Sequence, residues 1–497
     1  MRTLCAASVL AALLAASCGG VKDKEPDQLT IAVPSEPSNF DLLYSASMLE
    51  GQIGNNIYDN LLAFDEQGSA SPYLAEACEA SPDGLTYTFR LRKGVRFHNG
   101  EELKASDLAF TVEYGKNTPN GSRLCGAVAA MELIDGYTLR LTLKEPMASF
   151  LAEFAGDQFA VYNEKAVRSA GTYGAEPVGT GAYRYAGRDA GAELRLEAFE
   201  DHFRGPPPIK RLRYRVIADD FSAAAALQSG EVDLIWSLGA AAAANLEGQA
   251  DIAVRADPSN RVNYLTMNVE RPPFDQPKLR QAVNYALNRE AIRDAVYEGR
   301  PVERDAMPFP WMIGFAGPAL RYGYDPQRAE ALAREAGISP EAPARLSLLV
   351  TAATSRIGEL VQQDMAAIGI GLSLETLEFN AWIDRYYRGE FSMAVGGYFM
   401  TIADMNMLAT FYSSQAIGAG NSARYRSAEA DRLFALGRRE TDPLRRAAIY
   451  QRLADRVQED APYAVFANPP IIRAAHKALR IGRSGPNGIL MRDVSWE

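Results

Sequence analysis

Few residues in this chain have the type and spacing that acid–base, nucleophilic or metal chemistry requires. The 497 residues include only three histidines, His98, His202 and His476, and each lies far from the others in the sequence. Metal sites and histidine-assisted catalysis need such residues at close spacing with Cys, Asp or Glu partners. We therefore expect structural or solvated histidines, and neither a metal nor a cofactor.

Motifs that accompany catalysis or nucleotide binding are also missing from the sequence. There is no G-x-S-x-G, no P-loop, no H-E-x-x-H and no C-x-x-C. The glycines at Gly179 and Gly181 lack the third glycine of a dinucleotide fingerprint, and a strand-like AYRY follows them. The carboxylates are numerous, but their spacing singles out no acid–base pair. We expect no catalytic residues and a protein that is not an enzyme.

The first twenty residues, MRTLCAASVLAALLAASCGG, have the pattern of an export signal that ends at a cysteine. Arg2 precedes an apolar run too short to span a bilayer, and small residues lie just before Cys18. This pattern predicts a signal peptide over residues 1–17 and a lipid-carrying Cys18 at the start of a tether over residues 18–26. It resembles the lipobox of bacterial lipoproteins, except that Ala15 stands where leucine is usual. An ordinary cleaved signal or a short N-terminal anchor is the alternative.

The two remaining cysteines, Cys78 and Cys125, would lie after export in a compartment where disulfides persist. A bridge between them would close a long loop and stabilise the fold by roughly 4 kcal/mol. The alternative is two unconnected buried thiols, because Cys78 lies in the apolar-patterned segment PYLAEACEA. Both interpretations stay open at this point.

Composition narrows the class of partner. The formal net charge is −10, which argues against a surface that binds nucleic acid. No later stretch has the length and apolarity of a membrane-spanning helix, so we expect the body to be held at a membrane only through lipid on Cys18. The length exceeds what one hydrophobic core usually organises, which predicts two or three lobes. We also expect the protein to be a monomer.

The order of predicted elements indicates a mixed α/β protein. In the first half, LTIAVP reads as a buried strand, and alternating Tyr87, Phe89 and Leu91 between two turn signals predict a hairpin in an antiparallel sheet. From residue 279 onward, segments with helical spacing such as PLRRAAIYQRLADRVQED alternate with strands such as RLSLLVTAA. Such alternation is typical of an α/β lobe.

The segment PYLAEACEASPDGLTYTFRLRKGVRFHNGEELKASDLAFTVE resembles the signature region of the family 5 extracellular solute-binding proteins, the peptide- and nickel-binding receptors of ABC importers. Further matches in the same order include PVGTGAYRY, ALQSGEVD and NYLTMNVERPPFDQPKLRQAVNYALNREAI. The departures are Cys78 where tryptophan is usual and Asn99 where aspartate is usual. The resemblance covers essentially the whole mature chain.

This resemblance implies the fold of periplasmic binding proteins, with two lobes joined by crossing strands and a third, inserted domain. By analogy, residues 27–45, 178–265 and 475–497 would form lobe I. Residues 46–177 would form the inserted domain, and residues 266–474 would form lobe II.

The resemblance also indicates where a ligand would bind. Peptide-binding members carry a G-W-x-x-D-Y-type motif whose aspartate pairs with the α-amino group, and the corresponding stretch here begins GGYFMTIADM. Tyr398 replaces the tryptophan, and the amine-binding position is Thr401, or Asp404 if the register slips by three residues. The alternative for Asp404 is a helix cap before Met405. Weaker ligand-binding candidates are Trp236, Trp311, Asn268, Asn39 and Tyr44.

These features predict a lipid-anchored receptor in the periplasm or at the cell exterior. It would bind a peptide or similar polar solute in an interlobe cleft, close around it and deliver it to the subunits of an ABC permease. The alternative is an exported sensor or enzyme on the same scaffold. An enzyme would need a positioned nucleophile and base, which the sequence does not indicate.

Overall fold

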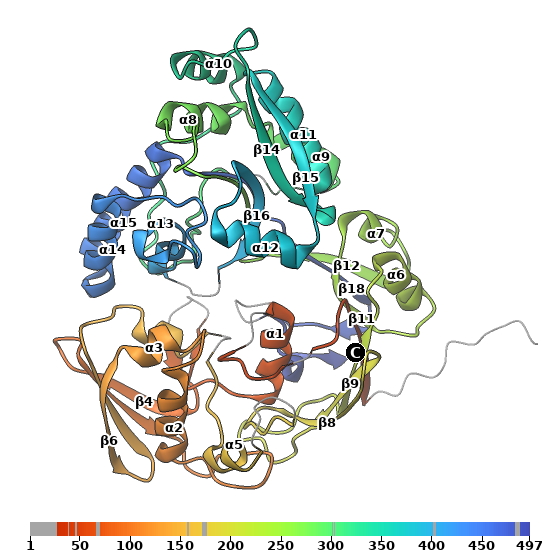
Figure 1. The fold of residues 1–497 in the computed structure, drawn as a ribbon. Helices are drawn as coiled ribbons and strands as arrows, with labels where there is room; N and C mark the ends of the chain where they lie inside the picture. Colours follow the sequence, from red (N-terminus) through yellow and green to blue (C-terminus); the bar gives the residue numbers. More distant parts are fainter. Residues whose placement is uncertain are drawn as a thin grey trace, which may run out of the picture.

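The computed structural model describes residues 27–497 except 38, 45–46, 66–69, 157–158, 171–175, 301, 303, 401–403 and 483–487. The predicted signal peptide, Cys18 and the tether lie outside the described residues, and so does Thr401. Among the described residues, three large sheets organise the chain into two lobes and an inserted domain (Figure 1).

Lobe I is built on a seven-stranded mixed sheet that gathers strands from both ends of the chain. Its central strand β1 pairs in parallel with β10 and β11. The alanine-rich helices α6 (Asp220–Gln228) and α7 (Ala240–Ala244) pack closely on one face, because small side chains let a helix approach the sheet. The strands in spatial order are β12 (Ile252–Asp257), β18 (Ile471–His476), β11 (Leu234–Leu238), β1 (Gln28–Val33), β10 (Arg211–Val216), β9 (Glu193–Ala198) and β8 (Tyr183–Asp189).

The inserted domain is built on a four-stranded antiparallel sheet, lower left in Figure 1. The alternation in β5 buries Tyr87, Phe89 and Leu91 on one face, and β5 pairs with β4 across the predicted Pro-Asp-Gly turn, so the predicted hairpin is confirmed. The strands in order are β4 (Ala75–Ala80), β5 (Thr86–Leu91), β7 (Thr138–Leu143) and β6 (Val128–Asp135). Around them lie α2 (Ala105–Gly115), α3 (Ser122–Gly126), α4 (Phe150–Glu153), α5 (Glu164–Ala170) and the strand pair β2 (Leu62–Phe64) and β3 (Ala70–Pro72). Helix α1 (Met48–Ile57) contacts β8 of lobe I.

Lobe II is built on a five-stranded sheet with helices on both faces. One face packs against α8 (Pro277–Ala286), α9 (Arg289–Val296), α10 (Pro326–Glu335) and α11 (Ser355–Ala366). The other packs against α13 (Ala409–Tyr412), α14 (Ala428–Arg439) and α15 (Pro443–Asp460), and α12 (Phe379–Arg388) covers one edge region. The strands in order are β15 (Ile370–Leu377), β14 (Ala344–Thr351), β16 (Met393–Phe399), β13 (Arg261–Met267) and β17 (Tyr463–Ala467).

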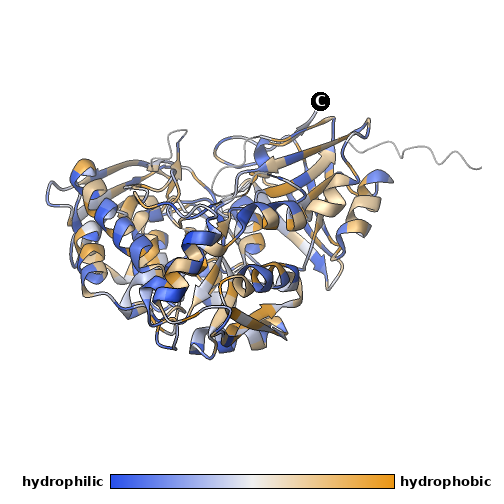
Figure 2. Ribbon diagram, turned by 90° about the horizontal axis from the view of Figure 1, so that it is seen from above, coloured by the Kyte–Doolittle hydropathy of each residue, from blue (hydrophilic) through white to orange (hydrophobic). Residues whose placement is uncertain are grey.

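Hydrophilic and hydrophobic stretches alternate along many of these helices (Figure 2). This alternation is expected for helices that bury one face on a sheet and expose the other to water. The C-terminal segment returns to lobe I, where β19 (Leu479–Arg480) pairs with β20 (Ser495–Trp496). Within the described part of the chain, no helix combines the length and apolarity needed to cross a membrane.

Two short segments carry the chain between lobe I and lobe II. The first lies between β12, which ends at Asp257, and β13, which begins at Arg261; the second lies between β17 and β18. The sequence placed the changes of lobe at 265/266 and 474/475, which fall inside β13 and β18. The two segments bond to each other, because Asn468 donates from Nδ2 to the Ser259 carbonyl at 3.1 Å.

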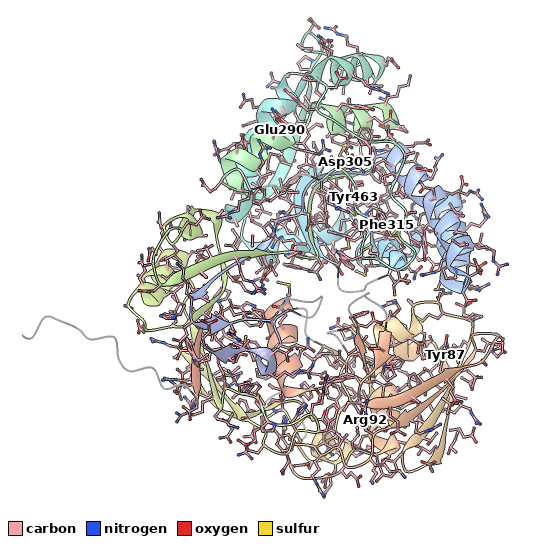
Figure 3. The ribbon with its side chains drawn as sticks, turned by 180° about the vertical axis from the view of Figure 1, so that it is seen from behind. Tyr87, Arg92, Glu290, Asp305, Phe315 and Tyr463 are labelled. Atoms are coloured by element: carbon pink, nitrogen blue, oxygen red, sulfur yellow. The ribbon has the colours of Figure 1, made fainter. Side chains whose placement is uncertain are left out.

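The inserted domain shares a hydrophobic core with lobe I, whereas lobe II has cores of its own. Buried side chains of the inserted domain and of one face of the lobe I sheet form one continuous cluster, which runs from Ile31 and Leu212 to Phe89 and Leu139. Lobe II has separate clusters on its own sheet. In Figure 3, Tyr87 and Arg92 lie in the inserted domain, and Asp305 and Tyr463 lie in lobe II.

Candidate functional site

A pocket of about 450 Å³ lies between lobe I and lobe II, beside the two crossing segments. Lobe I contributes Pro34, which follows β1, and the residues at and beyond the end of β11. Lobe II contributes Phe399 at the end of β16 and Ala353 beyond the end of β14. Since β1 and β11 are parallel, and β14 and β16 are also parallel, the pocket lies at the carboxyl ends of strands, where α/β folds commonly bind ligands. We call it the interlobe pocket.

Trp236 forms part of the lobe I wall of the interlobe pocket. It lies in β11 and is almost fully buried, at 2% exposure, with its ring edge-to-face against Tyr214 at 6.3 Å between centroids. These contacts hold the indole rigidly in the wall. Among the described residues, Trp236 is the one ligand-binding candidate named from the sequence that lines this pocket.

Arg261 and its neighbours form the polar part of the lobe II wall. Arg261 Nε donates to Asn263 Oδ1 at 3.0 Å, and Asn263 Nδ2 donates to the Tyr297 hydroxyl at 2.8 Å. The guanidinium also lies over the Phe399 ring, 5.2 Å from its centroid. Burial lowers the pKa of the Arg261 guanidinium. These contacts fix the orientation of a positive charge at the pocket wall.

A second arginine, Arg300, lines the same pocket and connects the lobes. It forms an ion pair with Glu247, which follows α7 in lobe I. Arg300 Nε is buried and has no hydrogen-bond partner among the residues that the structure describes. The pocket wall therefore holds two guanidinium groups, one of which is paired with a carboxylate.

Tyr398 and Asp404 have very different surroundings in the structure. Tyr398 is partly buried at the end of β16, edge-to-face against Phe411 at 5.1 Å, and burial raises the pKa of its phenol. Asp404 is completely buried, and its two oxygens bind Arg446 at 2.7 and 2.8 Å. Asp404 also accepts from the Asn406 amide at 2.8 Å as the cap of a short 3₁₀ helix. The expectation of a carboxylate facing the cleft is corrected here, because Asp404 is used within lobe II.

Asn268 lies away from the interlobe pocket, beyond the end of β13 opposite to Arg261. It is 1% exposed, its Nδ2 donates to the Gly389 carbonyl at 2.9 Å, and its Oδ1 accepts from the Glu270 amide at 3.1 Å. Both ends of the amide therefore stabilise a turn within lobe II. The expectation that Asn268 offers its amide to a ligand is corrected by these contacts.

The remaining aromatic and amide candidates lie outside the lining of the interlobe pocket. Asn39 Oδ1 accepts from the Asp41 amide at 2.8 Å in a turn after β1. Tyr44 is 46% exposed near Tyr114, and Trp311 is 38% exposed and stacked on Phe309 at 5.2 Å. Their exposed faces remain accessible to a ligand or partner.

The cysteines and histidines have structural surroundings. Cys78 and Cys125 are free thiols, so of the two possibilities that the sequence left open, the disulfide is not formed. Burial raises the pKa of each thiol to about 12. His98 bonds the Gly181 carbonyl through Nε2 at 2.9 Å and accepts from the Gly179 amide at Nδ1 at 3.3 Å, and burial lowers its pKa to about 4. His202 lies 3.5 Å from Asp59. The contacts of His98 and His202 join the inserted domain to lobe I.

The sequence did not identify Arg261, Asn263 and Tyr297 as site residues. The sequence did contain one indication of these residues. In RVNYLTM an arginine and an asparagine interrupt an otherwise apolar strand immediately after the chain crosses between the lobes. The partner Tyr297 lies at the end of α9, more than thirty positions later, so its contact with Asn263 could only come from the fold.

Comparison with known proteins defines the class of this chain. The family model for bacterial extracellular solute-binding proteins, family 5 middle, matches residues 69–419. Glutathione-binding protein GsiB of Pectobacterium atrosepticum is 27% identical over 497 residues, which cover 96% of this chain and 95% of that protein. Heme-binding protein A of Haemophilus influenzae is 30% identical over 462 residues, which cover 85% and 84% of the two chains.

A solved structure supports the same class. The periplasmic binding protein DppA of Helicobacter pylori, in complex with the peptide STSA, superposes with a TM-score of 0.82 at 26% identity, over 95% of this chain and 98% of that one. The chain therefore belongs to the family 5 bacterial extracellular solute-binding proteins. Members of this class are substrate-binding proteins of ABC transporters and not enzymes, and the family and fold predicted from the sequence are confirmed.

Proposed function

We propose that this protein is the lipid-anchored receptor of an ABC importer and binds a peptide or similar polar solute between its lobes. The observation that carries this proposal is the interlobe pocket, whose wall is shared by two lobes that only two segments connect. A ligand in such a pocket contacts both lobes only when they are closed, so binding favours the closed form. The permease then distinguishes the closed receptor from the open one.

Peptide is the favoured class of solute because of what similar proteins bind. The similar structure of DppA holds the peptide STSA, and the relatives include a dipeptide-binding protein of Escherichia coli at 28% identity. The pocket volume of about 450 Å³ lies within the usual range for small-ligand sites. Trp236 forms a rigid aromatic part of the pocket wall, with a small exposed fraction.

Tyr398 and Tyr44 would contact the parts of the ligand that extend from the interlobe pocket, since both keep an exposed fraction. Asn39 lies in the same turn region of lobe I as Tyr44. Thr401, in the unslipped register of the peptide-binding motif, remains the proposed position nearest the amino end. Asp404 is left out because Arg446 already binds both of its oxygens.

Native purification followed by mass spectrometry of the retained small molecules tests this function. We expect a peptide or another polar solute in stoichiometric amount, released on denaturation. Titration calorimetry with the identified compound should give one site per monomer, and size-exclusion chromatography should give the mass of one chain. Conversion of the retained compound by the protein, or failure to bind any peptide at millimolar concentration, would count against the proposed class.

The membrane anchor is a separate part of the proposal. Acylation of Cys18 would place the receptor at the outer surface of the membrane that holds its permease, with residues 18–26 as a tether. Intact mass of the membrane-extracted protein should show loss of residues 1–17 and addition of acyl chains. Cys18→Ser should release the protein from the membrane or block its processing. A mature N-terminus at another residue without lipid would contradict the anchor while leaving the receptor function intact.

A further inference from the structure

The interlobe pocket has an electrostatic character that differs from the rest of the chain. The formal net charge of the protein is −10, yet the charged residues that line the pocket are two arginines, Arg261 and Arg300. Among the described residues, no aspartate or glutamate belongs to the lining. A positive pocket in an acidic protein attracts anionic ligands selectively, because the field in the cleft opposes that of the surrounding surface.

Arg261 is the arginine whose charge is not compensated by the protein. In the described part of the chain it forms no ion pair, and its Nη1 and Nη2 make no hydrogen bond; its Nε is used by Asn263. The neighbouring Gly397 on β16 leaves the space that this arrangement needs, since a Cβ there would lie 3.3 Å from Arg261 Nη2 and 2.6 Å from Asn263 Oδ1. The two terminal nitrogens are therefore held in a fixed plane and remain available.

Arg300 adds an independent observation. Its Nη2 pairs with Glu247, whereas its Nε is buried without an acceptor among the described residues. A buried donor without an acceptor is unfavourable, and an acceptor supplied by a ligand would relieve it. Arg300 therefore adds a second positive charge at the pocket wall, and its Nε, which is closed to solvent in this structure, would meet a ligand acceptor only after the side chain shifts.

The aromatic and apolar parts of the lining favour a carboxylate of an organic molecule over inorganic phosphate. Trp236 and Phe399 line the pocket together with Val296 and Ile357. An organic ligand would bury apolar atoms against these side chains while its anionic group meets the guanidinium. Planar guanidinium groups bind carboxylates through two parallel hydrogen bonds, which require two free terminal nitrogens in one plane.

We propose that the interlobe pocket recognises a carboxylate of the transported solute, bound in a bidentate manner by Arg261 Nη1 and Nη2, with Arg300 as a second positive charge at the pocket wall. This inference rests on the proposed function and names the chemical feature that a peptide or similar solute must carry. Two sources of the carboxylate fit the chemistry, namely the C-terminus and an acidic side chain.

Two synthetic tripeptide mixtures of identical composition separate these sources. Both have free amino termini; one has C-terminal carboxylates and the other has C-terminal amides. The detergent-solubilised full-length protein is dialysed until it releases no ligand, incubated with each mixture, and analysed by mass spectrometry of the retained peptides. We expect the wild type to retain free-acid peptides at least tenfold more than their amides, which corresponds to about 1.4 kcal/mol.

Arg261→Gln should abolish this preference, and Arg261→Lys should keep part of it, because lysine retains the charge but not the planar pair of donors. The matched control is Arg345→Gln, which removes an equal charge from an exposed position near the start of β14. The control should behave as the wild type. Thermal melting of each variant shows whether a change in peptide retention reflects unfolding. The comparison of the two mixtures on the wild-type protein tests the proposal even if a variant fails to fold.

Each outcome decides between the hypotheses. Retention that follows aspartate or glutamate side chains in both mixtures, and that is lost in Arg261→Gln, supports the proposal and assigns the carboxylate to a side chain. Equal retention of neutral free-acid and amidated peptides by the wild type, or an unchanged preference in Arg261→Gln, would overturn it and leave the peptide receptor in place. Retention of no peptide from either mixture would overturn the peptide class and this inference together.

Discussion

The inserted domain and lobe II meet lobe I in opposite ways. The inserted domain shares a continuous apolar core with lobe I, and polar contacts such as that of His98 with Gly181 reinforce this boundary. Lobe II has cores of its own and joins lobe I through two crossing segments and the pair of Arg300 with Glu247. The first boundary makes one rigid body of two domains, whereas the second leaves the interlobe pocket between bodies that can separate.

This difference teaches where the chain can move. Opening the boundary of the inserted domain would expose fully buried side chains such as Phe89, at a cost of tens of cal/mol for each Å² of apolar surface. Opening lobe II from lobe I would break surface contacts and rotate the backbone near residues 258–260 and 468–470. We therefore expect two unfolding units and one hinge.

The largest effect is expected within lobe II. Asp404→Asn removes the charge that faces Arg446 in a buried pair, and loss of one partner of such a pair typically costs about 3–5 kcal/mol. Since lobe II has its own cores, a calorimetric scan should show a lowered transition for lobe II and an unchanged one for the rest. The double variant Asp404→Leu with Arg446→Met should recover much of the loss. One merged transition that shifts as a whole would contradict separate unfolding units.

A slightly smaller effect is expected at the fused boundary. A Cβ on Gly179 would overlap the carbonyl oxygen of Ile57, so Gly179→Ala must displace backbone and should cost about 3 kcal/mol. This loss should lower the unfolding transition of lobe I with the inserted domain and leave that of lobe II unchanged, whereas Asp404→Asn should lower only the transition of lobe II. Gly136→Ala is the matched control, because a Cβ there has no neighbour within 4 Å. Urea unfolding with separate probes of the two units measures both.

Acid should weaken the same boundary through His98. Burial lowers the pKa of His98 to about 4 in the folded protein. In the unfolded chain the ring has its ordinary pKa near 6.5, so below that pH the unfolded chain binds a proton while the ring in the folded protein stays neutral. Stability therefore falls as the pH drops from 6.5 to 4, and the loss at pH 5 is about 2 kcal/mol relative to neutral pH. In the neutral ring Nδ1 accepts from the Gly179 amide, a bond that protonation removes.

A variant that does not titrate in this pH range isolates the contribution of His98 to the pH dependence of stability. His98→Gln should be less stable than the wild type at pH 7, but the difference between the two should shrink toward pH 5. Chemical unfolding at both pH values measures it. A constant difference between pH 7 and pH 5 would show that another group controls the acid response.

Sequence reasoning predicted the fold well where patterns are local. Alternation in TYTFRL and the Pro-Asp-Gly turn fixed a hairpin that the structure contains, and the ordered family motifs gave the periplasmic binding protein fold. The changes of lobe were misplaced by several residues, because a strand that follows a crossing continues the apolar pattern of the strand before it. Only the pairing of β13 with β16 and β17 shows that Arg261 already belongs to lobe II.

The site was harder to predict because its contacts join distant segments. Trp236 was named because it lies where a lobe I strand would run toward the cleft; it belongs to β11 and lines the interlobe pocket. Asp404 was one of two positions predicted by analogy for the amine anchor, with a helix cap before Met405 as the alternative, and the structure shows the cap. Its partner Arg446 lies 42 positions later on α15, which no local pattern reveals. Asn268 was predicted in the strand that enters lobe II, with its amide offered to a ligand. It directly follows that strand, β13, but the interlobe pocket lies at the other end of β13, which only the arrangement of the strands in the sheet reveals.

The smallest effect on stability, and a selective effect on closure, is expected at the edge where the inserted domain touches lobe II. Glu145 forms ion pairs with Arg438 and Arg439 at the end of α14, and the Ala148 amide donates to the Arg438 carbonyl at 2.9 Å. These side chains are partly exposed, so the pairs contribute at most about 1 kcal/mol. They form only when the lobes are together.

Glu145→Gln should therefore leave both unfolding transitions nearly unchanged while it lowers the population of the closed form. We expect solute affinity to fall by up to about fivefold and the ligand-free radius of gyration from small-angle scattering to increase slightly, with the same shift in the wild type at high salt. Glu132→Gln is the control, since Glu132 pairs with Arg140 inside the inserted domain and does not bridge the lobes. If the two variants bind the solute with equal affinity and show the same salt dependence, these surface pairs do not contribute to closure, and the crossing segments and the interlobe pocket alone govern it.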